Sequence, residues 1–168
     1  MRLFLTISFT LFSLASLLGQ TDLELKKHLI DGVNSFNEAE HENAATSFAE
    51  GSELEGHEDI AAYNRGRALM ETEDLEDAIG SFKSAIEKSE NPLLKSRAWY
   101  NTGNLNLMSG EIEKAVESYK SALKEDPSFA EARNNLSEAF KLMQQQQQQD
   151  QQQDQQQDQD QDQDQQDQ

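Results

Sequence analysis

A repeated pattern of small and aromatic residues limits what this chain can fold into more than any other feature. Three segments, at residues 28–54, 62–88 and 99–125, share the same markers in the same register. The markers are a glycine, an alanine and an aromatic residue: Gly32, Ala44 and Phe48, then Gly66, Ala78 and Phe82, then Gly103, Ala115 and Tyr119. Each marker recurs after 34 and then 37 residues. A period of this length is typical of stacked supersecondary units, so the sequence predicts a repeat protein.

Each repeat reads as two helices joined by a short turn. In the third repeat the second helix has one apolar face, formed by Ile112, Ala115, Val116, Tyr119, Ala122 and Leu123. Gly110 predicts the turn before this helix, and Pro127 predicts its end. Gly103 lies inside the first helix, where it costs about 1 kcal/mol relative to alanine. We expect close approach of the partner helix at Ala115 and Ala122 to compensate for that cost.

The spacing and identity of these residues resemble the tetratricopeptide repeat, a helix-turn-helix unit of about 34 residues. In the third repeat, the residues that fit the motif are Trp99, Gly103, Ala115, Tyr119, Ala122 and Pro127. In the second repeat, they are Gly66, Ala78, Phe82 and Ala85. In the first repeat, Gly51 stands where Ala85 stands in the second. The three additional residues of the longer spacing fall around Pro92, which predicts a loop there.

The resemblance implies an all-α fold, a tetratricopeptide helix-turn-helix solenoid of three repeats with a C-terminal capping helix. The repeats cover about residues 25–58, 59–95 and 96–129. Residues 130–143 are expected to form the capping helix that covers the open end of the stack. Its apolar face consists of Ala132, Leu136, Ala139, Phe140 and Met143. Residues 20–143 together are the expected folded domain.

Both ends of the chain differ from the repeats in composition. Residues 1–19 have Arg2 followed by an uncharged apolar run, which is typical of a secretory signal peptide. Cleavage would export the protein to the periplasm or the periplasmic face of the envelope. The alternative is an uncleaved membrane anchor, the one case in which membrane contact is expected. Residues 144–168 contain only glutamine and aspartate, which predicts a tail that is disordered or at most transiently helical. The tail would either keep the chain soluble or self-associate through glutamine.

Composition and motifs exclude several functions. The chain has 14 lysines and arginines against 32 aspartates and glutamates, so its net charge of −18 excludes a nucleic-acid partner. It has no cysteine, and neither His41 nor His57 is followed by the second histidine of a zinc motif. Phosphate-binding loops and nucleophile motifs are also missing from the sequence. We therefore expect a non-enzymatic protein with no catalytic residues, no metal, no cofactor and no small-molecule substrate.

The resemblance further implies that a partner peptide binds in a groove lined by the first helix of each repeat. The candidate residues are Tyr63, Asn64 and Arg67 in the second repeat and Arg97, Tyr100, Asn101, Asn104 and Met108 in the third. Asn101 and Asn104 can equally be ordinary solvated helix residues. Some members of the family clamp a C-terminal carboxylate with lysine and asparagine. Here Leu29 and Val33 occupy the comparable places, so the full clamp is expected to be absent, although two arginines in the groove favour an acidic segment.

An exported chain with three repeats, a capping helix and a Gln/Asp tail resembles the small repeat proteins of the Bacteroides aerotolerance (Bat) group. Relatives in that group occur beside von Willebrand factor A-domain membrane proteins and a MoxR-type AAA ATPase. The resemblance implies a protein–protein interaction scaffold or adaptor in the cell envelope, within a complex linked to stress and oxygen tolerance. The alternative is a generic periplasmic co-chaperone or envelope assembly factor.

Overall fold

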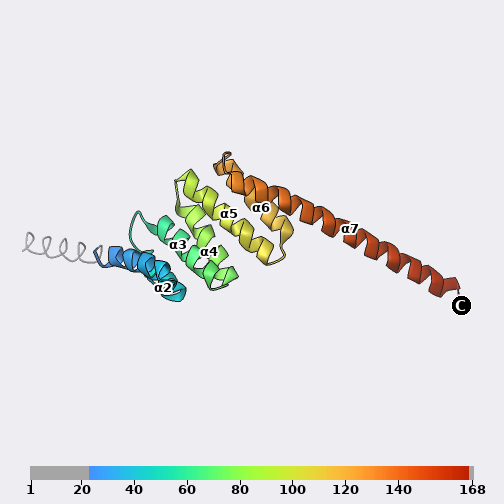
Figure 1. Cartoon of the computed structure of the whole chain (residues 1–168), viewed down its shortest axis with the longest axis horizontal. Coiled ribbons are helices and arrows are strands. Elements are labelled where there is room, and N and C mark those ends of the chain that lie inside the picture. Colours follow the sequence, from blue (N-terminus) through green and yellow to red (C-terminus); the bar gives the residue numbers. More distant parts are fainter. Residues whose placement is uncertain (1–22, 167–168) are drawn as a thin grey trace, which may run out of the picture. The chain divides into compact units, whose positions relative to one another are not determined.

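The computed structural model describes residues 23–166, and every regular element in that range is a helix (Figure 1). After a helix at residues 23–37 come α2 (His41–Gly51), α3 (Glu58–Glu71), α4 (Leu75–Lys88), α5 (Pro92–Met108), α6 (Ile112–Glu125) and α7 (Ala130–Gln166). The predicted all-α fold of paired helices is therefore confirmed. The expected signal peptide lies outside the described residues. Within them, no helix combines the length and the apolar character needed to cross a membrane.

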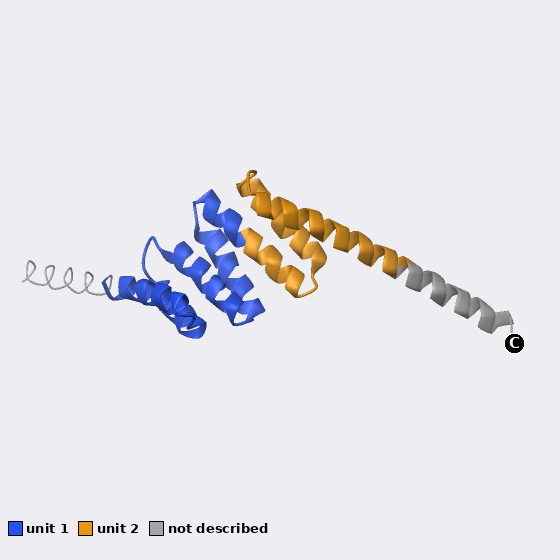
Figure 2. Ribbon diagram, in the orientation of Figure 1, with its two compact units in different colours: residues 1–98 blue, residues 99–168 orange. Residues whose placement is uncertain are grey.

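The chain separates into two compact units, residues 1–98 and 99–168, and the boundary falls within α5 (Figure 2). In the first unit, α3 packs against both α2 and α4. In the second, α7 packs against α6. Two of the predicted repeats therefore belong to the first unit. The third repeat and the capping helix make up most of the second.

The repeat markers lie where the two helices of a pair meet. A Cβ atom placed on Gly103 would lie 2.5 Å from the ring of Tyr119, and one on Gly66 would lie 2.8 Å from the ring of Phe82. A Cβ atom placed on Gly32 would likewise lie 2.8 Å from the ring of Phe48. The expected close approach of the partner helix to Gly103 is confirmed, but the nearest contact comes from Tyr119 rather than from Ala115 or Ala122. Both alanines are fully buried, but it is the aromatic marker whose ring fills the space that a side chain on the glycine would occupy.

The turn inside each repeat contains one residue with left-handed backbone. Gly110 has φ 74° in the third repeat, as expected for a glycine that ends a helix. Ala39 (φ 61°) and Glu73 (φ 59°) occupy the corresponding positions in the first and second repeats. A Cβ in this conformation crowds the following carbonyl, so both residues carry a steric cost that Gly110 avoids.

We expect Ala39→Gly to raise the free energy of unfolding by about 0.5–1 kcal/mol, because glycine adopts positive φ without that crowding. Thermal unfolding followed by circular dichroism would measure the rise in Tm. Ala49→Gly, inside α2, is the matched control, and it is expected to lower Tm because glycine destabilises a helix interior. A Tm for Ala39→Gly at or below that of the wild type would contradict the prediction.

Pro92 does not lie in a loop, and the sequence-based expectation was wrong. It is the first residue of α5, a position where the missing N–H costs nothing and the fixed φ suits the helix. The Asn91 carboxamide accepts a hydrogen bond from the Leu93 backbone N–H at 3.0 Å, which caps the helix. The three additional residues therefore extend α5 at its start rather than lengthening the turn.

The capping helix is longer than predicted. Ala132 and Ala139 are buried, and Ala139 joins Ala115, Val116 and Tyr119 in one apolar cluster. The helix does not end near residue 143 as expected, because α7 continues to Gln166 (Figure 1). Glutamine is a good helix former, and neither proline nor glycine occurs between 130 and 166 to end the helix.

Deleting residues 144–168 is expected to leave Tm unchanged, because residues 144–149 are exposed and the buried residues that the structure describes in α7, Ala132 and Ala139, precede them. The helical circular dichroism signal should fall only by the contribution of the residues removed. Deleting residues 130–168 is the contrasting variant. It removes Ala139 from the apolar cluster and should lower Tm clearly. A comparable loss of Tm in both deletions would contradict the prediction.

Candidate functional site

The helix at residues 23–37 and α3 form a small cleft of about 100 Å³ in the first unit, which we call the inner cleft. Its lining residues are Val33, Phe36, Asn37, Phe48, Asn64 and Arg67. Two of the residues predicted for the peptide groove, Asn64 and Arg67, thus lie on one surface. They project from the same side of α3 because three residues separate neighbours on a helix face.

The ring of Phe36 forms one wall of the inner cleft and contacts two neighbouring side chains. The guanidinium of Arg67 lies 4.6 Å from the centroid of the Phe36 ring, within the range of a cation–π interaction. The His41 ring packs edge-on against the same ring, with centroids 5.2 Å apart. Phe36 therefore positions the guanidinium over the cleft.

The inner cleft combines a single charge with an exposed apolar margin. Arg67 is the only charged residue of the lining, and it forms no ion pair with any carboxylate among the described residues. Val33 of the lining is 45% exposed, and Ile30 and Ile60, one helical turn from Val33 and Asn64 on the same helix faces, are 60% and 46% exposed. These three side chains form the apolar margin. The sequence-based prediction missed Phe36 and this margin. The spacing of Ile30, Val33 and Phe36 could have revealed them, because residues three apart lie on one face of a helix.

The other candidate groove residue of α3, Tyr63, is half-buried and packs against the buried ring of Phe82, with centroids 5.7 Å apart. Arg97 is exposed on α5. In the second unit Asn101 is half-buried and Met108 is 58% exposed. Tyr63 therefore contributes mainly to packing, whereas Arg97 and Met108 are open to solvent.

Tyr100 and Asn104 have hydrogen-bond partners within the second unit, so Asn104 is not an ordinary solvated helix residue. The Asn104 carboxamide oxygen accepts hydrogen bonds from the Tyr119 hydroxyl at 2.8 Å and from the Asn135 carboxamide at 3.0 Å. Asn135 also donates to the Tyr100 hydroxyl at 3.3 Å. The Tyr100 ring packs against the ring of Phe129, with centroids 4.9 Å apart. These contacts attach the start of α7 to α5.

The Tyr119 hydroxyl in this network is the donor to Asn104. Removal from water raises the pKa of the Tyr119 phenol above its ordinary value, which already lies well above neutral pH. Sequence reasoning could not pair Asn104 with Asn135, because 31 residues separate them and polar side chains on a helix carry no periodic signal of their partners.

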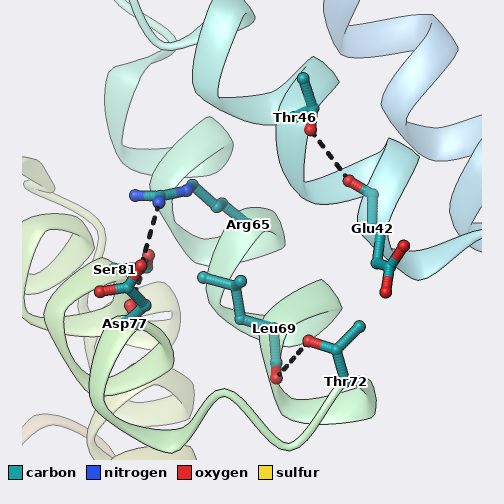
Figure 3. Close-up of polar contacts among 7 residues, drawn as sticks. All are labelled: Glu42, Thr46, Arg65, Leu69, Thr72, Asp77 and Ser81. Atoms are coloured by element: carbon teal, nitrogen blue, oxygen red, sulfur yellow. Dashed lines mark hydrogen bonds and ion pairs between the residues drawn. The ribbon is translucent and has the colours of Figure 1, made fainter.

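A second concave surface in the first unit lies between α2, α3 and the start of α4, and we call it the outer groove (Figure 3). Its volume is about 480 Å³, and its lining residues are Glu42, Ala45, Thr46, Ala49, Arg65, Leu69, Thr72 and Asp74. Figure 3 shows Arg65 reaching from α3 to Asp77 of α4, where the ion pair measures 3.8 Å. The sequence carries little signal of this groove, because its lining residues come from α2, from α3 and from the turn that follows α3.

Comparison of the sequence with known families identifies the repeats. The sequence profile of the tetratricopeptide repeat matches residues 38–92, 63–128 and 107–141, which together span more than half of the chain. The chain belongs to the tetratricopeptide repeat family. No curated protein sequence matches it.

Solved tetratricopeptide domains share the fold of this member of the family. The first TPR of Spaghetti (RPAP3), bound to the HSP90 peptide SRMEEVD, is 19% identical, with a TM-score of 0.63 over 74% of this chain and 94% of that one. The second TPR domain of human RPAP3, in complex with the HSP70 peptide SGPTIEEVD, is 21% identical, with a TM-score of 0.60 over 69% and 98%. The TPR2B domain of yeast Sti1, in a pHsp70 complex, is 20% identical, with a TM-score of 0.64 over 71% and 98%. Identities this low establish a common fold and nothing about ligands.

Proposed function

We propose that this protein is a non-enzymatic adaptor that binds a peptide segment of a partner protein in the inner cleft. The observation that carries the proposal is the unpaired Arg67 held over Phe36 beside an exposed apolar margin. Exposed apolar side chains next to one oriented cation suit a peptide more than a small polar metabolite. The solved relatives that hold the peptides SRMEEVD and SGPTIEEVD add support, since those peptides are bound by domains of the same fold.

The chemistry of the inner cleft favours a peptide with a carboxylate next to an aliphatic residue. Arg67 provides the positive charge, and the Asn64 carboxamide can hydrogen-bond a peptide group. Val33 lines the cleft at one of the places where some relatives hold a terminal carboxylate, so the partner would meet an apolar contact there instead. Leu29, at the other such place, packs against Gly51 of α2. The peptide would gain affinity from burial of its aliphatic side chain and specificity from Arg67.

We further propose that the protein works in the cell envelope, as a scaffold in a Bat-type complex. The basis is the signal-peptide pattern of residues 1–19 together with the resemblance of the repeat arrangement to that group. Its partners would then be von Willebrand factor A-domain membrane proteins and a MoxR-type ATPase system. A general periplasmic co-chaperone remains the second candidate, because several solved relatives hold HSP70 or HSP90 peptides.

Affinity capture from detergent-solubilised envelopes, with the mature chain as bait, tests the proposal. We expect a short, defined set of partners that includes A-domain proteins, and a loss of that set with Arg67→Glu. Lys83→Glu, on the exposed surface of α4, makes the same charge change and should retain the partners. A broad set of unrelated envelope proteins would favour the co-chaperone. Retention of all partners by Arg67→Glu would exclude the inner cleft.

A further inference from the structure

We propose that the outer groove is a second binding surface, separate from the inner cleft, for a partner segment in which an aliphatic side chain is flanked by lysine or arginine. The groove is large enough for this role. Its volume of about 480 Å³ lies within the usual range of ligand sites, roughly 300–1,000 Å³. Ala45, Ala49 and Leu69 line it without filling it.

The floor of the outer groove offers apolar contacts even at its hydroxyl-bearing residues. The Thr46 hydroxyl donates a hydrogen bond to the Glu42 backbone carbonyl at 3.0 Å, and the Thr72 hydroxyl donates to that of Leu69 at 3.1 Å (Figure 3). Each hydroxyl proton is already donated to a nearby backbone carbonyl. The two threonines therefore offer an occupant their methyl groups rather than a free hydrogen-bond donor. The groove therefore favours an aliphatic side chain over a polar one.

The charged side chains around the groove determine which residues beside the aliphatic anchor of a bound segment are favoured. Arg65 pairs with Asp77 at 3.8 Å, with the two side chains 37% and 62% exposed, so its charge is largely balanced. Glu42 and Asp74 line the groove without a cationic partner among the described residues. Two carboxylates thus remain uncompensated, and they are complementary to lysine or arginine on either side of an aliphatic anchor.

The charge of the whole chain favours the same occupant. At −18, the protein attracts a cationic segment from a distance. The same net charge disfavours a second copy of the chain in the groove, because the two copies would repel each other.

The outer groove and the inner cleft can be occupied at the same time. Arg65 lines the groove and Arg67 lines the cleft, and two residues along α3 correspond to a rotation of roughly 200° about its axis. The two surfaces therefore lie on different sides of one helix. A protein with both could hold an acidic segment on one side and a basic segment on the other.

The test is a titration of the whole chain with capped hexapeptides, followed by ¹H–¹⁵N NMR. The probe is KLKKLK, and the controls are KSKKSK, which lacks the aliphatic anchor, and ELEELE, which reverses the charge. We expect KLKKLK to bind about tenfold more tightly than KSKKSK, since one leucine side chain is removed from water in the groove, and ELEELE not to bind. The shifted amides should be those of Thr46, Ala49, Leu69 and Thr72, while those of Asn64 and Arg67 should stay unchanged.

Paired substitutions separate a defined site from general attraction to an acidic protein. Glu42→Gln with Asp74→Asn should weaken KLKKLK binding about five- to tenfold. Glu113→Gln with Glu131→Gln removes the same charge from exposed positions on α6 and α7 and should have almost no effect. The proposal would be overturned if KLKKLK did not bind, or if it bound no more tightly than KSKKSK. It would also be overturned if the two pairs of substitutions had equal effects on binding, or if the amides of Asn64 and Arg67 shifted. Envelope capture through the inner cleft is tested separately, with Arg67→Glu.

Discussion

Replacing Phe82 with alanine is expected to lower the free energy of unfolding by about 3–5 kcal/mol. The side chain is fully buried between α3 and α4 and packs against the Tyr63 ring. Its ring also lies 2.8 Å from the place where Gly66 would carry a Cβ atom. Because Gly66 has no side chain that could move into the vacated space, the cavity would stay largely open. Chemical denaturation followed by circular dichroism would measure the loss.

The matched control for this substitution is Phe140→Ala. The Phe140 side chain is 41% exposed and has Lys120 above its ring at 5.6 Å, so its removal should cost less than about 1 kcal/mol. If Phe82→Ala proves unfolded without denaturant, Phe82→Leu keeps most of the volume and keeps the comparison measurable. Equal losses for the two alanine variants would mean that the aromatic marker of the repeat does not hold the helix pair together.

Much of the fold could be predicted because the repeat markers encode helix pairing directly. Gly110 and Pro127 mark the ends of helices by backbone chemistry that is local in sequence, and both assignments agree with the structure. Pro92 was misplaced because proline is compatible both with a loop and with the first turn of a helix. The length of α7 was underestimated because the absence of apolar residues removes tertiary packing but not helix propensity.

The candidate surfaces were harder to predict, because each depends on residues brought together from separate helices. Asn64 and Arg67 share a cleft since they lie three residues apart on α3. The Phe36 ring that positions Arg67 comes from a different helix. The outer groove exists where side chains are small, and small residues such as Ala45 and Ala49 indicate helix contact and open space equally well in a sequence.

Gly103→Ala is expected to destabilise the protein by about 1–2 kcal/mol, although alanine is the better helix former. The new methyl carbon would lie 2.5 Å from a ring carbon of Tyr119, and overpacking of this kind costs roughly 1–3 kcal/mol. The ring cannot easily move away. Its hydroxyl is hydrogen-bonded to Asn104 at 2.8 Å, and Tyr100 packs against its face, with centroids 5.9 Å apart. The higher helix propensity of alanine offsets at most about 1 kcal/mol of this loss in stability.

Gly80→Ala should have the opposite effect and is the control that isolates the contact. Gly80 also lies inside a helix, α4, but a Cβ atom placed on it would meet nothing within 4 Å. Only the gain in helix propensity remains, so stability should rise by about 0.5–1 kcal/mol. Denaturation curves of the two variants should therefore shift in opposite directions. A shift in the same direction would mean that Tyr119 can yield to a methyl group, and that the glycine marker reflects backbone conformation rather than the close approach of an aromatic ring.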